Sequence, residues 1–135
     1  MALEPAPLPR LKGLCILAVD DDEAGRRTTK LVLERHLCRV HTVAQGADAV
    51  QAVRTHAPDL VLLDWVMPKV SGLEVLQQLR ADAELAATPV VVLSAYVDDG
   101  VRGQAQAAGV LGVLDRGDWT QLGAQLDRLL ADATP

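Results

Sequence analysis

The chain has 135 residues, which is long enough for one domain with a buried core. Half of the residues are hydrophobic, yet there is no Phe, one Tyr and two Trp, so the core must consist mainly of Leu, Val and Ala. The formal net charge is −5 and no run of Lys or Arg occurs, which argues against direct binding to nucleic acid.

The first eleven residues carry three prolines and lack the apolar stretch of a signal peptide. We expect residues 1–11 to be a flexible lead-in and residues 12–135 to form one domain. The sequence contains no expected membrane span, and its two cysteines, Cys15 and Cys38, fit reduced core positions. The expected location is therefore the cytoplasm, without membrane attachment.

The first half of the chain alternates short apolar runs with segments of helical pattern. Residues 14–19, 39–44 and 60–63 are expected to be strands, because apolar runs without polar alternation are typical of strands covered on both faces. Residues 24–37 form an expected helix that follows a run of acids, which complement the positive end of a helix. A second helix is expected at 47–57 and stops before Pro58.

The second half continues the alternation. Ser71 and Glu74 have the spacing of a capping box, which predicts the start of a third helix. Residues 90–93 form an expected strand between Pro89 and Ser94, and a fifth strand is expected at 111–114. Residues 99–108 are a weaker helix prediction because the two glycines in that segment lower helix propensity. Residues 119–131 place Trp and Leu at helical spacing and predict the last helix.

Five strands alternating with five helices indicate an α/β fold with a parallel sheet and right-handed crossovers. The expected architecture is a flavodoxin-like, doubly wound five-stranded parallel sheet with strand order 2-1-3-4-5. This order places the first and third strands side by side, so that their carboxyl ends meet.

Carboxylates follow two of the expected strands. Asp20 and Asp21 come after the first strand and Asp64 after the third, so the three side chains are expected to converge. Clustered carboxylates repel one another unless a cation lies among them, and oxygen ligands suit a magnesium-type ion. The sequence therefore predicts a divalent metal site, with Mg²⁺ as the cofactor.

Four motifs in register resemble the receiver domain of bacterial two-component response regulators, in its stand-alone, chemotaxis-regulator-like form. The resemblance covers about residues 14–130. Its motifs are Asp20-Asp21, Asp-Trp-Val-Met-Pro from Asp64, Ser-Gly-Leu-Glu from Ser71, and Val-Val-Leu-Ser-Ala-Tyr around Ser94.

The resemblance implies a role for each matching residue. Asp64 would be the phosphoacceptor, taking a phosphoryl group from a sensor histidine kinase, a phosphotransfer protein or a small acyl phosphate. Asp21 would bind Mg²⁺ directly, Asp20 through water, and the backbone carbonyl of Val66 would complete the ligands. Ser94 would hydrogen-bond the phosphoryl group and move toward it. The protein would assist its own phosphorylation and dephosphorylation without being an enzyme for another substrate.

The expected fifth strand departs from the family pattern. Arg116 stands where receivers usually have Lys, Gly117 where they have Pro, and Val113 where many have a switch aromatic. Two interpretations of Arg116 stay open: it reaches the phosphate in place of Lys, or it is a solvated surface charge. Lys and Arg are not equivalent, because Arg is longer and presents a planar fork of donors.

Two functions follow from the sequence. In the first, the chain is a phosphorylatable single-domain receiver in a phosphorelay, with an unidentified downstream protein as partner. In the second, the departures at Arg116 and Val113 mark a pseudo-receiver that binds proteins without phosphorylation. The acidic residues favour the first. The exposed faces of the first, fourth or fifth helices could also pair two copies in a homodimer.

Overall fold

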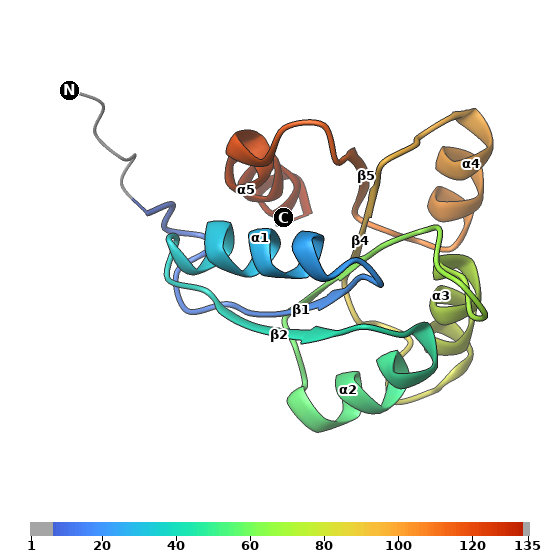
Figure 1. Cartoon of the computed structure of the whole chain (residues 1–135). Helices are drawn as coiled ribbons and strands as arrows, with labels where there is room; N and C mark the ends of the chain where they lie inside the picture. The colour runs from blue at the N-terminus through green and yellow to red at the C-terminus, as the bar shows by residue number, and fades with distance from the viewer. Residues whose placement is uncertain (1–6, 134–135) are drawn as a thin grey trace.

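The computed structural model describes residues 7–133 and has a five-stranded parallel sheet in the order β2-β1-β3-β4-β5 (Figure 1). The strands are β1 (Cys15–Val19), β2 (Arg39–Val43), β3 (Leu60–Leu63), β4 (Val90–Ser94) and β5 (Gly112–Asp115). The helices are α1 (Glu23–Glu34), α2 (Ala49–His56), α3 (Gly72–Ala81), α4 (Asp99–Ala107) and α5 (Leu122–Ala133). Short 3₁₀ turns, η1 (Gly46–Asp48) and η2 (Trp119–Gln121), precede α2 and α5. The flavodoxin-like prediction is confirmed.

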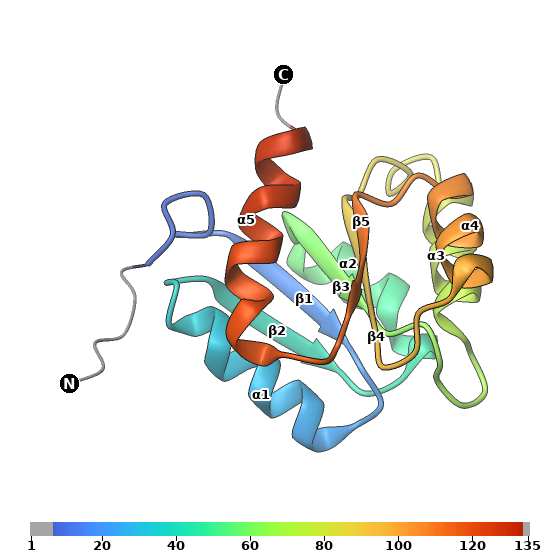
Figure 2. The same cartoon turned by 90° about the horizontal axis from the view of Figure 1, so that it is seen from above.

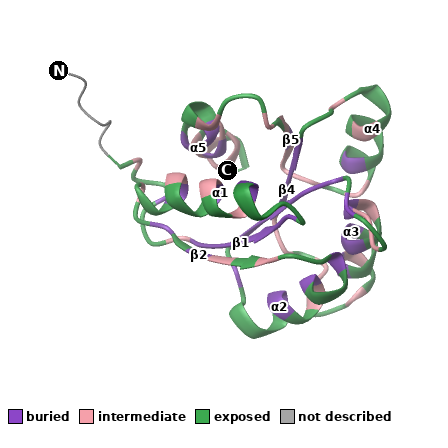
Figure 3. Ribbon diagram, in the orientation of Figure 1, coloured by how far each residue is buried: buried purple, intermediate pink, exposed green. Residues whose placement is uncertain are grey.

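Helices cover both faces of the sheet. Figures 1 and 2 show α1 and α5 on one face and α2, α3 and α4 on the other. Each face has its own apolar cluster, which contains Leu33 and Leu126 on the first face and Val53, Leu76 and Ala105 on the second. The strands between them are buried along their length in the centre of the sheet (Figure 3), which explains why β1, β3 and β4 are apolar without alternation. No helix within residues 7–133 is long and apolar enough to cross a membrane.

Boundaries of the first, second and last helices differ from the predictions, and the last helix begins at Leu122 after the 3₁₀ turn η2. The first helix was expected to reach residue 37 but ends at Glu34, and Leu37 adopts a positive φ of 65°. This left-handed residue turns the chain so that its carbonyl accepts a hydrogen bond from Gly13 N–H at 2.9 Å. The second helix starts as the 3₁₀ turn η1 and ends at His56, because Ala57 is also left-handed. The strand positions agree with the predictions to within one residue.

The prediction that residues 1–11 form a flexible lead-in is partly wrong. Residues 1–6 lie outside the described part of the chain, but Leu11 is fully buried in the apolar cluster beneath α1 and α5. Leu8 N–H donates to His36 Nδ1 at 3.2 Å, and the Cys38 thiol donates to the Leu11 carbonyl at 3.2 Å. Proline content indicated flexibility, whereas burial of Leu8 and Leu11 fixes this turn against the domain.

Arg80, near the end of α3, ties together two loops at the amino ends of β4 and β5. Its guanidinium donates to the carbonyls of Ala86 (3.1 Å) and Thr88 (2.8 Å) before β4, and of Ala108 (2.8 Å) and Gly109 (3.3 Å) before β5. Burial lowers the pKa of Arg80, and these carbonyls compensate for the lost hydration. This contact lies at the edge of the sheet opposite the acidic residues.

Candidate functional site

Three carboxylates meet at the carboxyl edge of the sheet. Val19 and Leu63 are partners in the β1·β3 register, so the residues that follow them lie next to each other. One carboxylate oxygen from each of Asp20, Asp21 and Asp64 lies within 4.8 Å of the others. Asp20 and Asp64 are buried and Asp21 is exposed. The predicted convergence of these side chains is therefore present in the structure.

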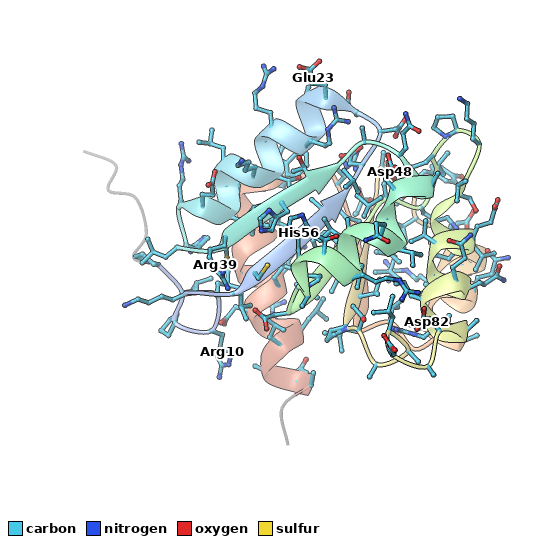
Figure 4. The ribbon with its side chains drawn as sticks, turned by 90° about the horizontal axis from the view of Figure 1, so that it is seen from below. Arg10, Glu23, Arg39, Asp48, His56 and Asp82 are labelled. Carbon is cyan, nitrogen blue, oxygen red and sulfur yellow. The ribbon has the colours of Figure 1, made fainter. Side chains whose placement is uncertain are left out.

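Asp20 is held by the first turn of α1. Its Oδ1 accepts a hydrogen bond from Asp22 N–H at 2.9 Å, and its backbone carbonyl accepts one from Arg26 Nη1 at 2.8 Å. Asp22 caps the helix by accepting from Gly25 N–H, while Glu23 points away from the sheet into solvent (Figure 4). Asp22 is therefore the N-cap of α1 and Glu23 lies in its first turn, where acids complement the positive end of a helix.

Asp64 lies at the end of β3, where the chain turns toward α3. Its N–H donates to the Val19 carbonyl at 2.9 Å, and its Oδ1 faces Val66 N–H at 3.4 Å. The amino end of α3 approaches this turn closely, with Gly72 N–H donating to the Trp65 carbonyl at 2.9 Å. Ser71 caps α3 by accepting from Glu74 N–H at 3.2 Å, as the capping-box pattern predicted.

Arg116 extends from the end of β5 into the acidic cluster. Its Nη2 donates to Asp20 Oδ2 at 2.8 Å and lies 3.6 Å from Asp64 Oδ2. Its guanidinium carbon lies 5.9 Å from the centroid of the Trp119 ring, within the range of a cation–π contact. The side chain is 16% exposed, so the interpretation of Arg116 as a solvated surface charge is wrong.

The environment of Asp64 raises the pKa of its carboxyl group to about 6. Burial is the largest cause, because the charged form loses hydration. The positive charge of Arg116 opposes this shift and is the next largest influence. The negative charges of Asp20 and Asp21 raise the pKa further, and the Val66 N–H lowers it. Asp64 therefore needs an additional positive charge to ionise as readily as an ordinary carboxylate.

Ser94 ends β4 at the same edge of the sheet and is buried. Its hydroxyl donates to the Tyr96 carbonyl at 3.1 Å and accepts from Tyr96 N–H at 3.3 Å, so it is bonded within its own loop. Tyr96 itself is 72% exposed to solvent. The Ser94 carbonyl accepts from Arg116 N–H at 2.9 Å, which joins the ends of β4 and β5.

Residues 16–118 match the family model of the response regulator receiver domain. The chain belongs to this family. It is 37% identical over 84 residues to the transcriptional regulatory protein AfsQ1 of Streptomyces coelicolor, and that match covers 62% of this chain and 36% of AfsQ1. It is 38% identical over 79 residues to the protein PilH of Pseudomonas aeruginosa, covering 58% of this chain and 65% of PilH.

Solved structures share the fold of this receiver domain. The chemotaxis protein CheY4 of Vibrio cholerae superposes with a TM-score of 0.80 at 24% sequence identity, over 87% of this chain and 98% of that chain. The chain spans 36% of the length of AfsQ1 and 65% of PilH, so parts of those curated relatives have no counterpart in the match. The receiver domain is a phosphoacceptor module of two-component signalling.

The acidic cluster of this receiver domain fits a divalent cation. Three carboxylates face one guanidinium, so negative charge is left in excess, and hard oxygen donors suit such an ion. A cavity of about 10 Å³ lies among Asp20, Asp64, Arg116 and apolar strand residues, which is room for about one water molecule. Asp21, at the exposed side, lines a separate hollow of about 290 Å³.

Three contributors to the site were missed in the sequence. A Cβ at Gly25 would lie 2.5 Å from Asp20 Oδ2, and one at Gly72 would lie 2.7 Å from Trp65 Cα, so both positions require glycine for close approach. A glycine in the first turn of an expected helix, where Ala is preferred, is the signal that could have revealed them. Trp119 was assigned to a helix face, and nothing in its spacing indicated contact with Arg116.

Proposed function

We propose that the chain accepts a phosphoryl group on Asp64 from a sensor histidine kinase or phosphotransfer protein in a phosphorelay. The observation that carries this proposal is the convergence of Asp20, Asp21 and Asp64 at the edge of a receiver-domain sheet. A protein-binding module that works without phosphate has no need to hold three repelling carboxylates together. We extend the proposal to a cytoplasmic location and to one acting domain that includes the turn around Leu11.

Mg²⁺ is the proposed cofactor. Asp21 and Asp64 would hold it through their carboxylates, Val66 through its backbone carbonyl, and Asp20 through a water molecule. When bound, Mg²⁺ supplies positive charge that neutralises the negative charge building up on the transferring phosphoryl group. Two buried carboxylates and an exposed one support this assignment, because an ion can enter from the side of Asp21.

The protein groups have separate tasks in the transfer. A carboxylate oxygen of Asp64 forms a bond to phosphorus, while the bond from phosphorus to the donor breaks and its electron pair leaves with the donor. The guanidinium of Arg116 would donate to a phosphoryl oxygen, and the Ser94 hydroxyl would donate to another after leaving the Tyr96 carbonyl. Both groups lie at the strand ends beside Asp64, which supports these tasks.

The proposal is tested by incubating the protein with Mg²⁺ and acetyl phosphate and measuring its intact mass. We expect one phosphate adduct on the wild type, and none on Asp64→Ala or after Mg²⁺ is removed with EDTA. Asp48→Ala is the matched control, because Asp48 is an exposed acid at the start of α2 and caps no helix through its side chain (Figure 4). Absence of an adduct on the wild type, or equal adducts on the wild type and Asp64→Ala, would favour the pseudo-receiver function instead.

A further inference from the structure

Arg116 reaches into the acidic cluster where a divalent cation is proposed to bind. Its Nη2 is 2.8 Å from Asp20 Oδ2 and 3.6 Å from Asp64 Oδ2, so one nitrogen lies between two of the three carboxylates. The main chain holds Arg116 in place, since its N–H donates to the Ser94 carbonyl. The guanidinium therefore already supplies part of the positive charge that the cluster requires.

Asp20 has one carboxylate oxygen left for a second cation. Oδ1 accepts from Asp22 N–H at 2.9 Å, so that oxygen is committed to the first turn of α1. Oδ2 is the oxygen that Arg116 binds. An incoming divalent ion that contacts Asp20 Oδ2, directly or through water, meets the positive guanidinium there.

The guanidinium of Arg116 does not have all of its hydrogen-bond donors satisfied in this arrangement. Within residues 7–133 its side chain donates a single hydrogen bond, to Asp20, and its Nε is buried without a hydrogen-bond partner. A buried N–H without an acceptor is unfavourable, so this arrangement is not the best that the guanidinium could find. Its other contacts are the Asp64 carboxylate, with Oδ2 at 3.6 Å, and the Trp119 ring at 5.9 Å.

Trp119 is fixed independently of Arg116. It begins η2, where Asp118 accepts hydrogen bonds from Thr120 N–H at 2.9 Å and from the Thr120 hydroxyl at 2.6 Å. Its ring packs against the apolar cluster under α1 and α5. The face of this ring beside the guanidinium favours the Arg116 rotamer that points at Asp20.

We propose that Arg116 is a built-in counter-cation of the acidic cluster that competes with the divalent metal for Asp20, and that Trp119 is the positioning residue that holds it there. Metal binding then moves Arg116 off Asp20, which leaves it free to meet a phosphoryl group, and changes the surroundings of Trp119 in η2. The inference rests on the proposed function, because it concerns the metal of the same site.

The competition is tested by titrating the full chain with Mg²⁺ in a calorimeter, without any phosphodonor. Arg116→Met removes the guanidinium and keeps an apolar stem, and we expect it to bind Mg²⁺ about tenfold more tightly than the wild type, as loss of one charge-assisted hydrogen bond allows. Arg26→Met is the matched control. It removes the same charge beside Asp20, but Arg26 bonds the backbone carbonyl and not the carboxylate.

The inference fails if Arg116→Met binds Mg²⁺ no more tightly than the wild type or than Arg26→Met, or if neither protein binds Mg²⁺. This calorimetric test is independent of the intact-mass measurement of phosphorylation. Tight Mg²⁺ binding by Arg116→Met together with no phosphate adduct on the wild type would overturn the proposed function and leave the competition standing.

The role of Trp119 is tested by two variants and a spectrum. Trp119→Leu keeps an apolar side chain without a ring face and should tighten Mg²⁺ binding severalfold, whereas Trp119→Phe should restore the wild-type affinity. With Trp65→Phe as background, Trp119 is the only tryptophan, and Mg²⁺ should change its emission. Equal affinities for Trp119→Leu and Trp119→Phe, or a spectral change that persists unaltered in Arg116→Met, would exclude Trp119 as the positioning residue.

Discussion

Asp64 is the residue where burial and function oppose each other. A carboxylate is a nucleophile in its ionised form, yet its surroundings raise its pKa from 3.8 to about 6. The folded protein therefore binds a proton at Asp64 more tightly than the unfolded chain does. In the absence of metal, ionising Asp64 at neutral pH lowers the stability of the fold.

This shift predicts how stability depends on pH. A folded-state pKa above the unfolded value gives a stabilising contribution that is complete below about pH 4 and is lost as the pH rises through about 6. In EDTA at pH 7, Asp64→Asn should therefore be more stable than the wild type by about 1–2 kcal/mol. Urea unfolding at several pH values measures this difference. If the difference in unfolding free energy between the wild type and Asp64→Asn stays the same from pH 4 to pH 7, the pH dependence of stability does not come from Asp64.

The sequence predicted which carboxylates meet but not where Arg116 points. Parallel register alone brings Asp20, Asp21 and Asp64 to one edge, because strand order determines which strand ends are adjacent. Arg116 has several rotatable bonds, and its direction depends on the Asp20 carboxylate and the Trp119 ring together. No local sequence pattern contains that information.

The close packing of the start of α3 against the end of β3 shapes the acidic edge of the sheet. Gly72 lies so close to the backbone of Asp64 and Trp65 that no side chain fits there. The capping residues Ser71 and Glu74 predicted where α3 begins, since capping depends on neighbours in sequence. The end of α1 was less predictable, because Leu37 adopts its left-handed conformation in a tertiary contact with Gly13.

Two glycine substitutions should have opposite effects. In Gly72→Ala the new Cβ would lie 2.7 Å from Trp65 Cα and collide with the Asp64 carbonyl, which should cost about 1–3 kcal/mol of stability. Gly103→Ala, in α4, meets no atom within 4 Å and should stabilise the protein by about 0.5–1 kcal/mol through helix propensity. Urea unfolding of both variants measures these changes. A Gly72→Ala protein as stable as Gly103→Ala would show that the two elements can separate without cost.

At the scale of the whole molecule, the sheet separates two apolar clusters, and the N-terminal turn belongs to one of them. Leu11 is as completely buried as Leu126 of α5. Arg10 in the same turn lies 3.4 Å from Asp127 of α5, although this exposed pair adds little. Alternating strands and helices predicted the sheet and its covering layers, whereas no periodic pattern indicated that Leu11, just after a proline-rich segment, is buried.

Truncating Leu11 should therefore behave as a core substitution. Leu11→Ala is expected to lower the free energy of unfolding by about 2–5 kcal/mol, because it leaves a cavity under α1 and α5. Leu31→Ala is the control, since Leu31 of α1 is 55% exposed and should change stability by no more than about 0.5 kcal/mol. Thermal and urea unfolding of the two variants compares them. If Leu11→Ala and Leu31→Ala are equally stable, the N-terminal turn does not unfold cooperatively with the rest of the domain.

Arg80 fixes the amino ends of β4 and β5 through four carbonyls, whereas the carboxyl ends of these strands can change their polar contacts. The loops entering β4 and β5 are joined to α3 through a single guanidinium, whereas Ser94 and Arg116 at the other ends of these strands make exchangeable polar contacts. We therefore expect a change at the carboxyl edge to move the strand ends there more than the loops that Arg80 holds together. Motion would then be largest where α4 and α5 connect to that edge.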